Sequence, residues 1–176
     1  MFKSSSIKVI LFGFIFTFFS SFGQSFFLGL FNSSLRDALS ISHGQFGSIY
    51  AAATLISSFI LVWIGKKIDD MNILKFASYV IILLAISCFL FSKISSIIFL
   101  FFSIFLMRLS GQGLMSHTSS TTISRYFNRR RGRALSGIWF GLSSAEFVLP
   151  ILVVFLLTIY SWQTIWHFIS IVIILI

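Results

Sequence analysis

The amino-acid sequence predicts an all-α integral membrane protein, on the basis of its composition, its hydropathy and the form of its apolar runs. Hydrophobic residues make up 57% and charged residues 10% of the 176 residues. A soluble domain has about 25% charged residues. Mean hydropathy is +1.02. The apolar runs are continuous and do not alternate with polar residues, so helices are expected rather than the strands of a membrane barrel.

Six membrane-spanning helices are expected, at residues 9–31, 45–64, 73–92, 95–124, 134–158 and 163–176. Charged residues separate these runs, and about 20 apolar residues are enough to cross the hydrocarbon core. The first run is too long for a signal peptide and lacks a small-residue cleavage site. The sixth run is still apolar at Ile176, so we expect it to be incomplete. The fourth and fifth helices carry a charge near their middle, Arg108 and Glu146 respectively.

Lysine and arginine indicate the orientation of these helices. If every predicted helix spans the membrane, one side carries ten basic residues and the other carries Arg36 and Lys93. The ten are Lys3, Lys8, Lys66, Lys67, Lys75, Arg125, Arg129, Arg130, Arg131 and Arg133. Because basic loops remain in the cytoplasm, we expect the N-terminus and the loops 66–75 and 125–133 there, with the helices in the plasma (cell inner) membrane.

The sequence also contains an internal repeat. A shift of 88 residues aligns Gly23-Gln24 with Gly111-Gln112, and it aligns helix 1 with helix 4 and helix 2 with helix 5. Two units of three helices in series must run in opposite directions, which predicts a 3+3 inverted repeat. Arg108 aligns with Ser20, so the arginine has no counterpart in the first unit.

Arg108 is the candidate functional residue that the pattern singles out. An arginine at the centre of a membrane helix costs about 2.5–3.5 kcal/mol on insertion scales, so it should face the protein interior and meet an anion. Glu146 is the nearest candidate partner, because both residues lie at a similar depth from the loop that joins their helices. We expect Glu146 to neutralise Arg108. The alternatives are that Arg108 binds a ligand and that Glu146 carries a proton.

Other polar residues could share that site. Gln112 lies one turn beyond Arg108 on the same face, and Gln24 is its repeat counterpart; such amides hydrogen-bond a substrate or link helices. His117 lies nine residues from Arg108 and is expected on the opposite face. Tyr50 is assigned to core packing. The candidate substrate-binding residues are Arg108, Gln112, Gln24 and Glu146.

Several classes of function are excluded. Cys88 is the single cysteine, and no histidines have metal-ligand spacing, so neither a metal nor a cofactor is expected. The net charge is +9, but the basic residues lie at the ends of apolar runs, which excludes a nucleic-acid partner. The segment from Gly141 to Ala145 lacks the second glycine of a nucleophile elbow and lies within a helix, so no enzyme is expected.

The loop after the second helix resembles a known signature. Gly65-Lys-Lys-Ile-Asp69-Asp-Met-Asn is similar, at Gly65 and Asp69, to the G-x-x-x-D-R-x-G-R signature of the major facilitator superfamily. The sequence departs from the signature at Asp70, Asn72 and Ile73. Lys75 is expected to supply the charge of the missing arginine. In the superfamily, the glycine permits close helix approach and the aspartate helps to hold the two halves together in gating.

The resemblance continues through the fourth helix. Arg108-Leu-Ser-Gly-Gln-Gly113 resembles the R-x-x-Q-G signature with a changed order of Gln and Gly. The segment from Arg125 to Gly137 is similar to the monocarboxylate and oxalate/formate branch. Its expected cytoplasmic loop carries Arg125, Arg129, Arg130, Arg131 and Arg133.

The resemblance implies that residues 1–176 form the six-helix N-terminal half of this fold, a fragment whose partner is a missing C-terminal half. It further implies a secondary active transporter that carries a small solute by alternating access. Because of Arg108, we expect an organic anion such as a monocarboxylate, with a coupling proton as a further partner. The alternative is a small multi-pass membrane scaffold or modulator protein without transport activity.

Overall fold

The computed structural model describes residues 4–176, with side chains from residue 6 onward. Residues 4–176 form helices joined by short turns and contain no β-strand. The predicted all-α fold class is therefore confirmed. Lys3, one of the ten basic residues assigned to the cytoplasm, lies outside the described residues.

The described helices are α1 (Ser4–Ser20), η1 (Ser21–Gly23), α2 (Ser25–Gly29), α3 (Asn32–Leu39), α4 (His43–Asp70), α5 (Ile73–Phe91), α6 (Ile97–Met107), η2 (Arg108–Met115), α7 (Ser116–Tyr126), α8 (Arg131–Leu157) and α9 (Trp162–Ile174). Here η1 is a 3₁₀-helix and η2 a π-helix. Together, α1, η1 and α2 form the first membrane span, and α6, η2 and α7 form the fourth. Within the described residues, five spans are long and apolar enough to cross a membrane, and α9 is a shorter apolar helix.

Polar residues before the helices fix several of these boundaries. Ser42 and Gln45 form a capping box, in which the Gln45 amide donates to Ser42 Oγ and the Ser42 amide donates to Gln45 Oε1. Asn72 Oδ1 accepts from the Leu74 amide at the start of α5, across the turn that follows α4. The capping box supplies partners for backbone amides that the first turn of α4 leaves free. Helix α4 therefore begins at His43, two residues before the predicted span.

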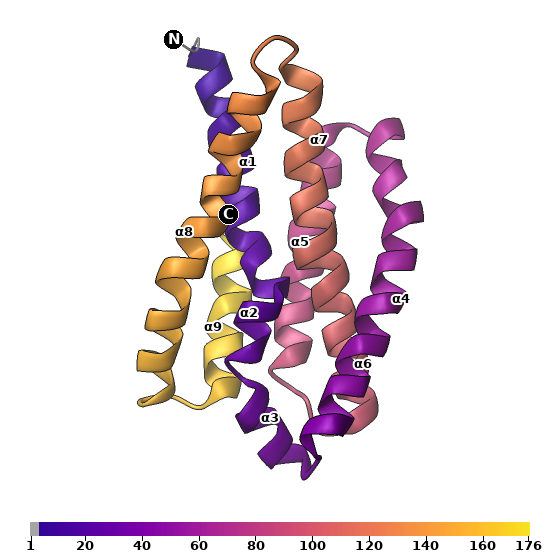
Figure 1. Ribbon diagram of the computed structural model, residues 1–176, viewed down its shortest axis with the longest axis vertical. Coiled ribbons are helices and arrows are strands. Elements are labelled where there is room, and N and C mark those ends of the chain that lie inside the picture. Colours follow the sequence, from indigo (N-terminus) through magenta and orange to yellow (C-terminus); the bar gives the residue numbers. More distant parts are fainter. Residues whose placement is uncertain (1–3) are drawn as a thin grey trace.

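The two halves of the bundle run in opposite directions (Figure 1). From the N-terminal end, α1 runs down, α4 up and α5 down, whereas α6–α7 run up, α8 down and α9 up. The helix packing has the symmetry of this repeat. Helix α1 packs on α8 as α4 packs on α6 and η2, and the third helices of the two halves, α5 and α9, pack on each other. This arrangement is the one that the 3+3 inverted repeat predicts.

Helix 1 and helix 4 meet at the two glycines that the repeat aligns. A Cβ atom added to Gly111 would lie 2.7 Å from the Cα atom of Gly23, and one added to Gly23 would lie 2.8 Å from the Cα atom of Gly111. Real Cβ contacts are never so short, so the two backbones touch directly, as small residues allow in membrane helices. The contact joins η1 to η2 and lies in the middle of the fourth span.

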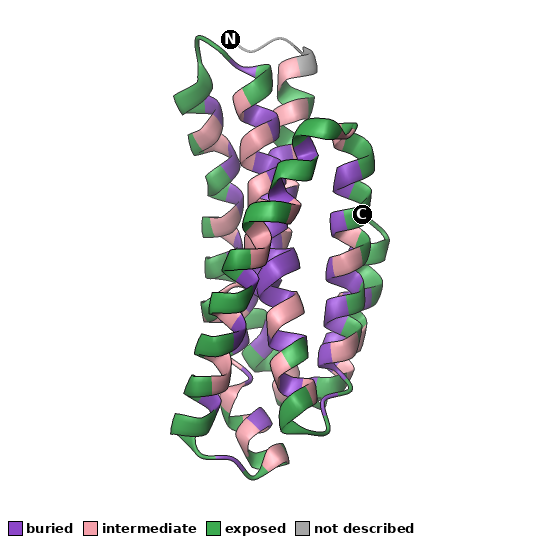
Figure 2. Ribbon diagram, turned by 90° about the vertical axis from the view of Figure 1, so that its right-hand side faces the viewer, coloured by how far each residue is buried: buried purple, intermediate pink, exposed green. Residues whose placement is uncertain are grey.

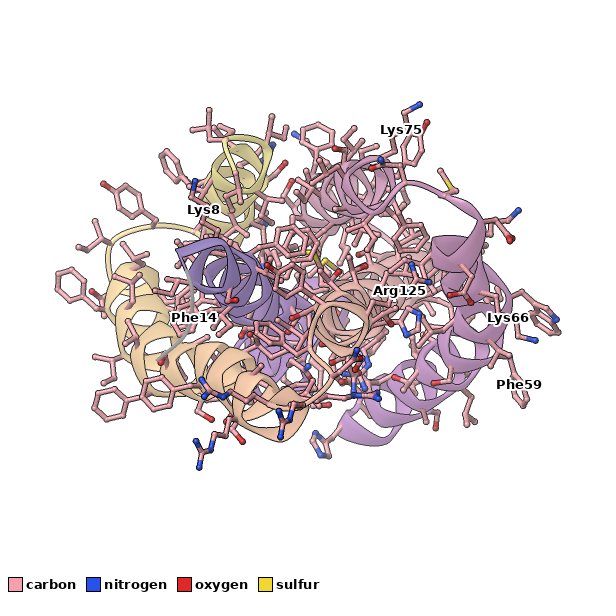
Figure 3. The ribbon with its side chains drawn as sticks, turned by 90° about the horizontal axis from the view of Figure 1, so that it is seen from above. Lys8, Phe14, Phe59, Lys66, Lys75 and Arg125 are labelled. Atoms are coloured by element: carbon pink, nitrogen blue, oxygen red, sulfur yellow. The ribbon has the colours of Figure 1, made fainter. Side chains whose placement is uncertain are left out.

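The outer surface of the bundle is apolar along its length and basic at one end. Figure 2 shows exposed positions along the outward faces of the helices. The exposed large apolar side chains include Phe59, Trp63, Phe147 and Phe155. Such a surface is suited to lipid rather than water. Figure 3 looks down on the end that carries the basic residues, among them Lys8, Lys66, Lys75 and Arg125. The opposite end carries Arg36 in α3 and Lys93 after α5.

Candidate functional site

Arg108 begins the π-helix η2 in the middle of the fourth span. Arg108 is 7% exposed. In a π-helix, backbone hydrogen bonds join residue i to residue i+5. Segments of this kind are rare and are frequent at functional sites. The contact between Gly111 and Gly23 lies within the same eight residues. Arg108 thus lies beside the direct backbone contact between helices 1 and 4.

The guanidinium of Arg108 bonds to the break in helix 1. Arg108 Nη1 donates to the carbonyl oxygen of Gly23 at 3.0 Å and to Ser25 Oγ at 3.2 Å. Gln24 between them has an extended backbone, so Gly23 is the last residue of η1 and its carbonyl is a helix C-terminal acceptor. The C-terminal end of a helix favours a cation. The ring of Tyr50 also faces the guanidinium, whose carbon lies 5.4 Å from the ring centroid.

Glu146 is not the partner of Arg108, so the expected ion pair between them is wrong. Glu146 is exposed on α8, and no ion pair joins it to Arg108 in the part of the chain that the structure describes. Similar depth does not decide which helix faces meet. Helix α8 places Gly141 against the Phe14 backbone of α1 and buries Ala145, and these contacts turn Glu146 outward.

A cavity of about 190 Å³ lies beside Arg108. It is lined by Ser57, Ser58, Leu61, Arg108, Gln112 and Gly113. Arg108 Nη2 has no hydrogen-bond partner among residues 4–176, and Nε is buried without one. Hydroxyl and amide groups on both walls add hydrogen-bonding capacity. The cavity therefore combines a permanent cation that retains donors with neutral polar groups.

His117 lies on the same side of the fourth span as Arg108, against the expectation of opposite faces. Nine residues make two and a half turns of an α-helix. The π-helix takes more residues per turn, so the same nine residues make about two turns. His117 Nε2 therefore lies 3.1 Å from the carbonyl oxygen of Gly65 on α4, and the lack of a side chain at Gly65 leaves room for the ring.

A second cavity of about 390 Å³ follows towards the basic end of the bundle. Its lining includes Lys66, Asp69, His117 and Thr121. At this end Arg125 forms an ion pair with Asp69, and Arg125 Nη1 also donates to the Ile68 carbonyl oxygen at 3.2 Å. Lys75, which was expected to supply the missing charge, makes no ion pair among the described residues. It lies apart from Arg125 at the perimeter of the bundle in Figure 3.

The structure therefore brings together part of the predicted set. Arg108 and Gln112 line one cavity, Gln24 lies in the break beside Gly23, and Glu146 lies elsewhere. The sequence reasoning missed Ser25 as a partner of Arg108 and assigned Tyr50 to core packing. One signal was present, because Gly23-Gln24 was already aligned with Gly111-Gln112 by the repeat.

Comparison with known proteins agrees with this architecture. The family model described as Major Facilitator Superfamily matches residues 13–176. No curated protein and no solved structure matches the chain significantly. The match extends from residue 13, within the first predicted helix, to residue 176, and it includes the Arg108 cavity and the Asp69–Arg125 ion pair. This chain belongs to the Major Facilitator Superfamily.

Proposed function

We propose that this member of a family of membrane transporters is a secondary active transporter of a small organic anion, with Arg108 as the residue that binds the anionic group. Transport would follow alternating access, with the N-terminus and the basic end of the bundle in the cytoplasm. A monocarboxylate is the first substrate class to test. Glu146, exposed on α8, has no part in binding the anion at Arg108.

The charge of Arg108 is the observation that supports this proposal. The residue lies mid-span, where an uncompensated charge is costly, and no carboxylate in residues 4–176 pairs with it. Its contacts are a carbonyl oxygen, a hydroxyl group and a ring face, all of them neutral. A carboxylate would form shorter and stronger charge-assisted hydrogen bonds with the unpaired nitrogens.

The remaining cavity residues support a small ligand. Gln112 and two serines face the space beside the guanidinium, and these groups can bond to hydroxyl or carbonyl oxygens of a substrate. The volume of about 190 Å³ is below that of drug-sized ligand pockets, which begin at about 300 Å³. We expect a second six-helix half of the same polypeptide to supply the facing wall, as the superfamily resemblance implies.

Uptake by cells that express the full-length protein tests the proposal. Radiolabelled lactate, oxalate and acetate are offered separately, with the neutral sugar alcohol glycerol as a non-anionic comparison. The wild type should accumulate at least one anion, and Arg108→Gln should reduce its uptake to the level of cells without the protein. Loss of this cation removes the only charge that faces the cavity in the described residues.

Arg133→Gln is the matched control, because it makes the same change at an exposed position outside the cavity. Its uptake should remain near that of the wild type. Membrane levels of both variants are measured by immunoblot. If Arg108→Gln reaches the membrane at normal levels and transports the anion normally, Arg108 has no substrate role. Uptake of glycerol with no uptake of any anion would contradict the substrate class.

A further inference from the structure

Three residues from three spans form a closed cluster around the guanidinium. The Tyr50 hydroxyl donates to Ser25 Oγ at 2.8 Å, and Arg108 Nη1 donates to the same oxygen at 3.2 Å. The Tyr50 ring faces the guanidinium carbon at 5.4 Å and stacks on the buried ring of Phe46 at 6.3 Å between centroids. The Tyr50 cluster, defined as Ser25, Tyr50 and Arg108, thus links α2, α4 and η2.

Arg108 is the boundary between this cluster and the cavity. Tyr50 and Ser25 do not line the cavity, whereas Ser57, Ser58 and Leu61 do. These three residues are two to three turns further along α4 than Tyr50, towards the basic end. The cluster therefore lies between the cavity and the end of the bundle that carries α3, as the course of α4 in Figure 1 shows.

We propose that Tyr50 is a positioning residue for Arg108, and that the Tyr50 cluster closes the anion site towards the α3 end of the bundle. This inference rests on the proposed function of Arg108. Tyr50 fixes the Ser25 hydroxyl, which together with the Gly23 carbonyl accepts from Nη1, and this leaves Nη2 free for the ligand. The aromatic ring also shields the cation from water on the side where no ligand binds.

The contacts of Arg108 with the Tyr50 cluster connect anion binding to opening of the site on the α3 side. The Gly23 carbonyl, the Ser25 hydroxyl and the Tyr50 ring are neutral partners, and a carboxylate is a stronger partner for a guanidinium than any of them. An anion bound at Nη2 therefore pulls the guanidinium towards the cavity, lengthens the Nη1 bonds to Gly23 and Ser25, and weakens the link between α2, α4 and η2. Without the anion, the link forms again and the site closes on the α3 side.

Thiol labelling of a cavity residue tests this proposal without any transported substrate. The full-length protein is prepared with Cys88 replaced by serine, together with any cysteine outside residues 1–176, and with Ser58→Cys as the reporter. Ser58 is an exposed residue that lines the cavity. The membrane-impermeant anionic reagent sulfonatoethyl methanethiosulfonate is applied either to intact cells or to inside-out vesicles. The labelling rate is followed by mass shift with a polyethylene glycol maleimide.

Tyr50→Ala removes both the ring and the hydroxyl, and it should raise the labelling rate from the α3 side about tenfold. Tyr50→Phe and Ser25→Ala remove one hydrogen bond each and should raise the rate by a smaller factor of about two to five. Labelling from the basic end should stay unchanged in all three variants. Tyr79→Ala is the matched control, since Tyr79 is exposed on α5 and lies outside the cluster.

Rates within twofold of the parent for all three variants would overturn the proposal, as would an equal increase from both sides. Size-exclusion profiles in detergent show whether each variant is folded, and the two conservative variants still test the cluster if Tyr50→Ala does not fold. If labelling is unaffected while Arg108→Gln abolishes uptake, the closure is wrong and the proposed function stands. If labelling rises while uptake survives Arg108→Gln, the cluster closes a site that has another function.

Discussion

Two arginines of the fourth span lie against α4, and they meet opposite kinds of partner. Arg108, mid-span and 7% exposed, contacts a carbonyl oxygen, a hydroxyl group and an aromatic ring. Arg125, at the basic end, forms an ion pair with Asp69. The side chains of that pair are 38% and 66% exposed. An arginine in the apolar middle of the span is therefore left without a countercharge, whereas an arginine at the water-exposed end is neutralised by a carboxylate.

This difference separates a binding role from a linking role. A permanent carboxylate beside Arg108 would satisfy the guanidinium and leave little affinity for a ligand anion. Neutral partners stabilise the cation while they preserve its charge. At the end of the span, water reduces the cost of both charges, so an ion pair there joins α4 to α7 without a large desolvation penalty. Each arginine thus has the partner that suits its depth.

Exchange of each arginine for lysine gives the largest expected contrast. A lysine at position 108 keeps the charge but has one compact ammonium group, which cannot hold the helix 1 break and also present a second nitrogen to the cavity. We expect Arg108→Lys to reduce the initial uptake rate about tenfold or more, with the anion identified in the uptake panel. Arg125→Lys should stay within about twofold, because an ammonium still pairs with Asp69. Equal losses in both variants would remove the distinction between the two arginines.

A smaller effect is expected from the backbone contact that supports the Arg108 region. Gly111→Ala places a methyl group 2.7 Å from the Cα atom of Gly23, where only backbone can give way. We expect a loss of about 1–3 kcal/mol in stability, typical of overpacking, read as a lower melting midpoint of the detergent-solubilised protein.

Gly47→Ala is the matched control for this change, since an added Cβ at Gly47 meets nothing within 4 Å. This variant should keep or raise the midpoint, because alanine is a better helix former than glycine by up to about 1 kcal/mol. A midpoint for Gly111→Ala equal to that of the wild type would show that helices 1 and 4 separate easily at this point.

The smallest effect is expected at the exposed ion pair. A double-mutant cycle with Asp69→Asn and Arg125→Gln should give a coupling free energy of about 0.2–1 kcal/mol, the usual range for exposed pairs. Because the pair is exposed, 1 M salt should reduce that coupling further. Melting midpoints of the four proteins in low and high salt provide the measurement. A coupling well above this range would mean that the pair is shielded from water in the full-length protein.

The sequence predicted the architecture because the bilayer imposes simple rules. Runs of apolar residues between charges marked the helices, and the excess of basic residues at one set of loops matches the end where Lys66 and Arg125 now lie. The repeat aligned Gly23 with Gly111, and these residues are in contact. The positions of the helices, the basic end and the glycine contact can all be read from the order of residues along the chain.

The site was harder to predict because it depends on local departures from the α-helix. The π-helix from Arg108 to Met115 brings His117 to the side of Arg108, which the 3.6-residue period does not allow. The break at Gln24 frees the Gly23 carbonyl as an acceptor for the arginine. Glu146 lies at a depth similar to that of Arg108, but depth carries no information on which helix faces meet, and Glu146 is exposed on α8.

The bond between Arg108 and the Gly23 carbonyl also has a consequence for biogenesis. These residues are 85 positions apart, and helix 1 leaves the ribosome long before Arg108 is synthesised. If the helices insert in the order of synthesis, we expect the acceptor to be in the bilayer when the fourth helix arrives with its cation. The order of synthesis thus allows a costly mid-span cation to enter the membrane beside a ready partner.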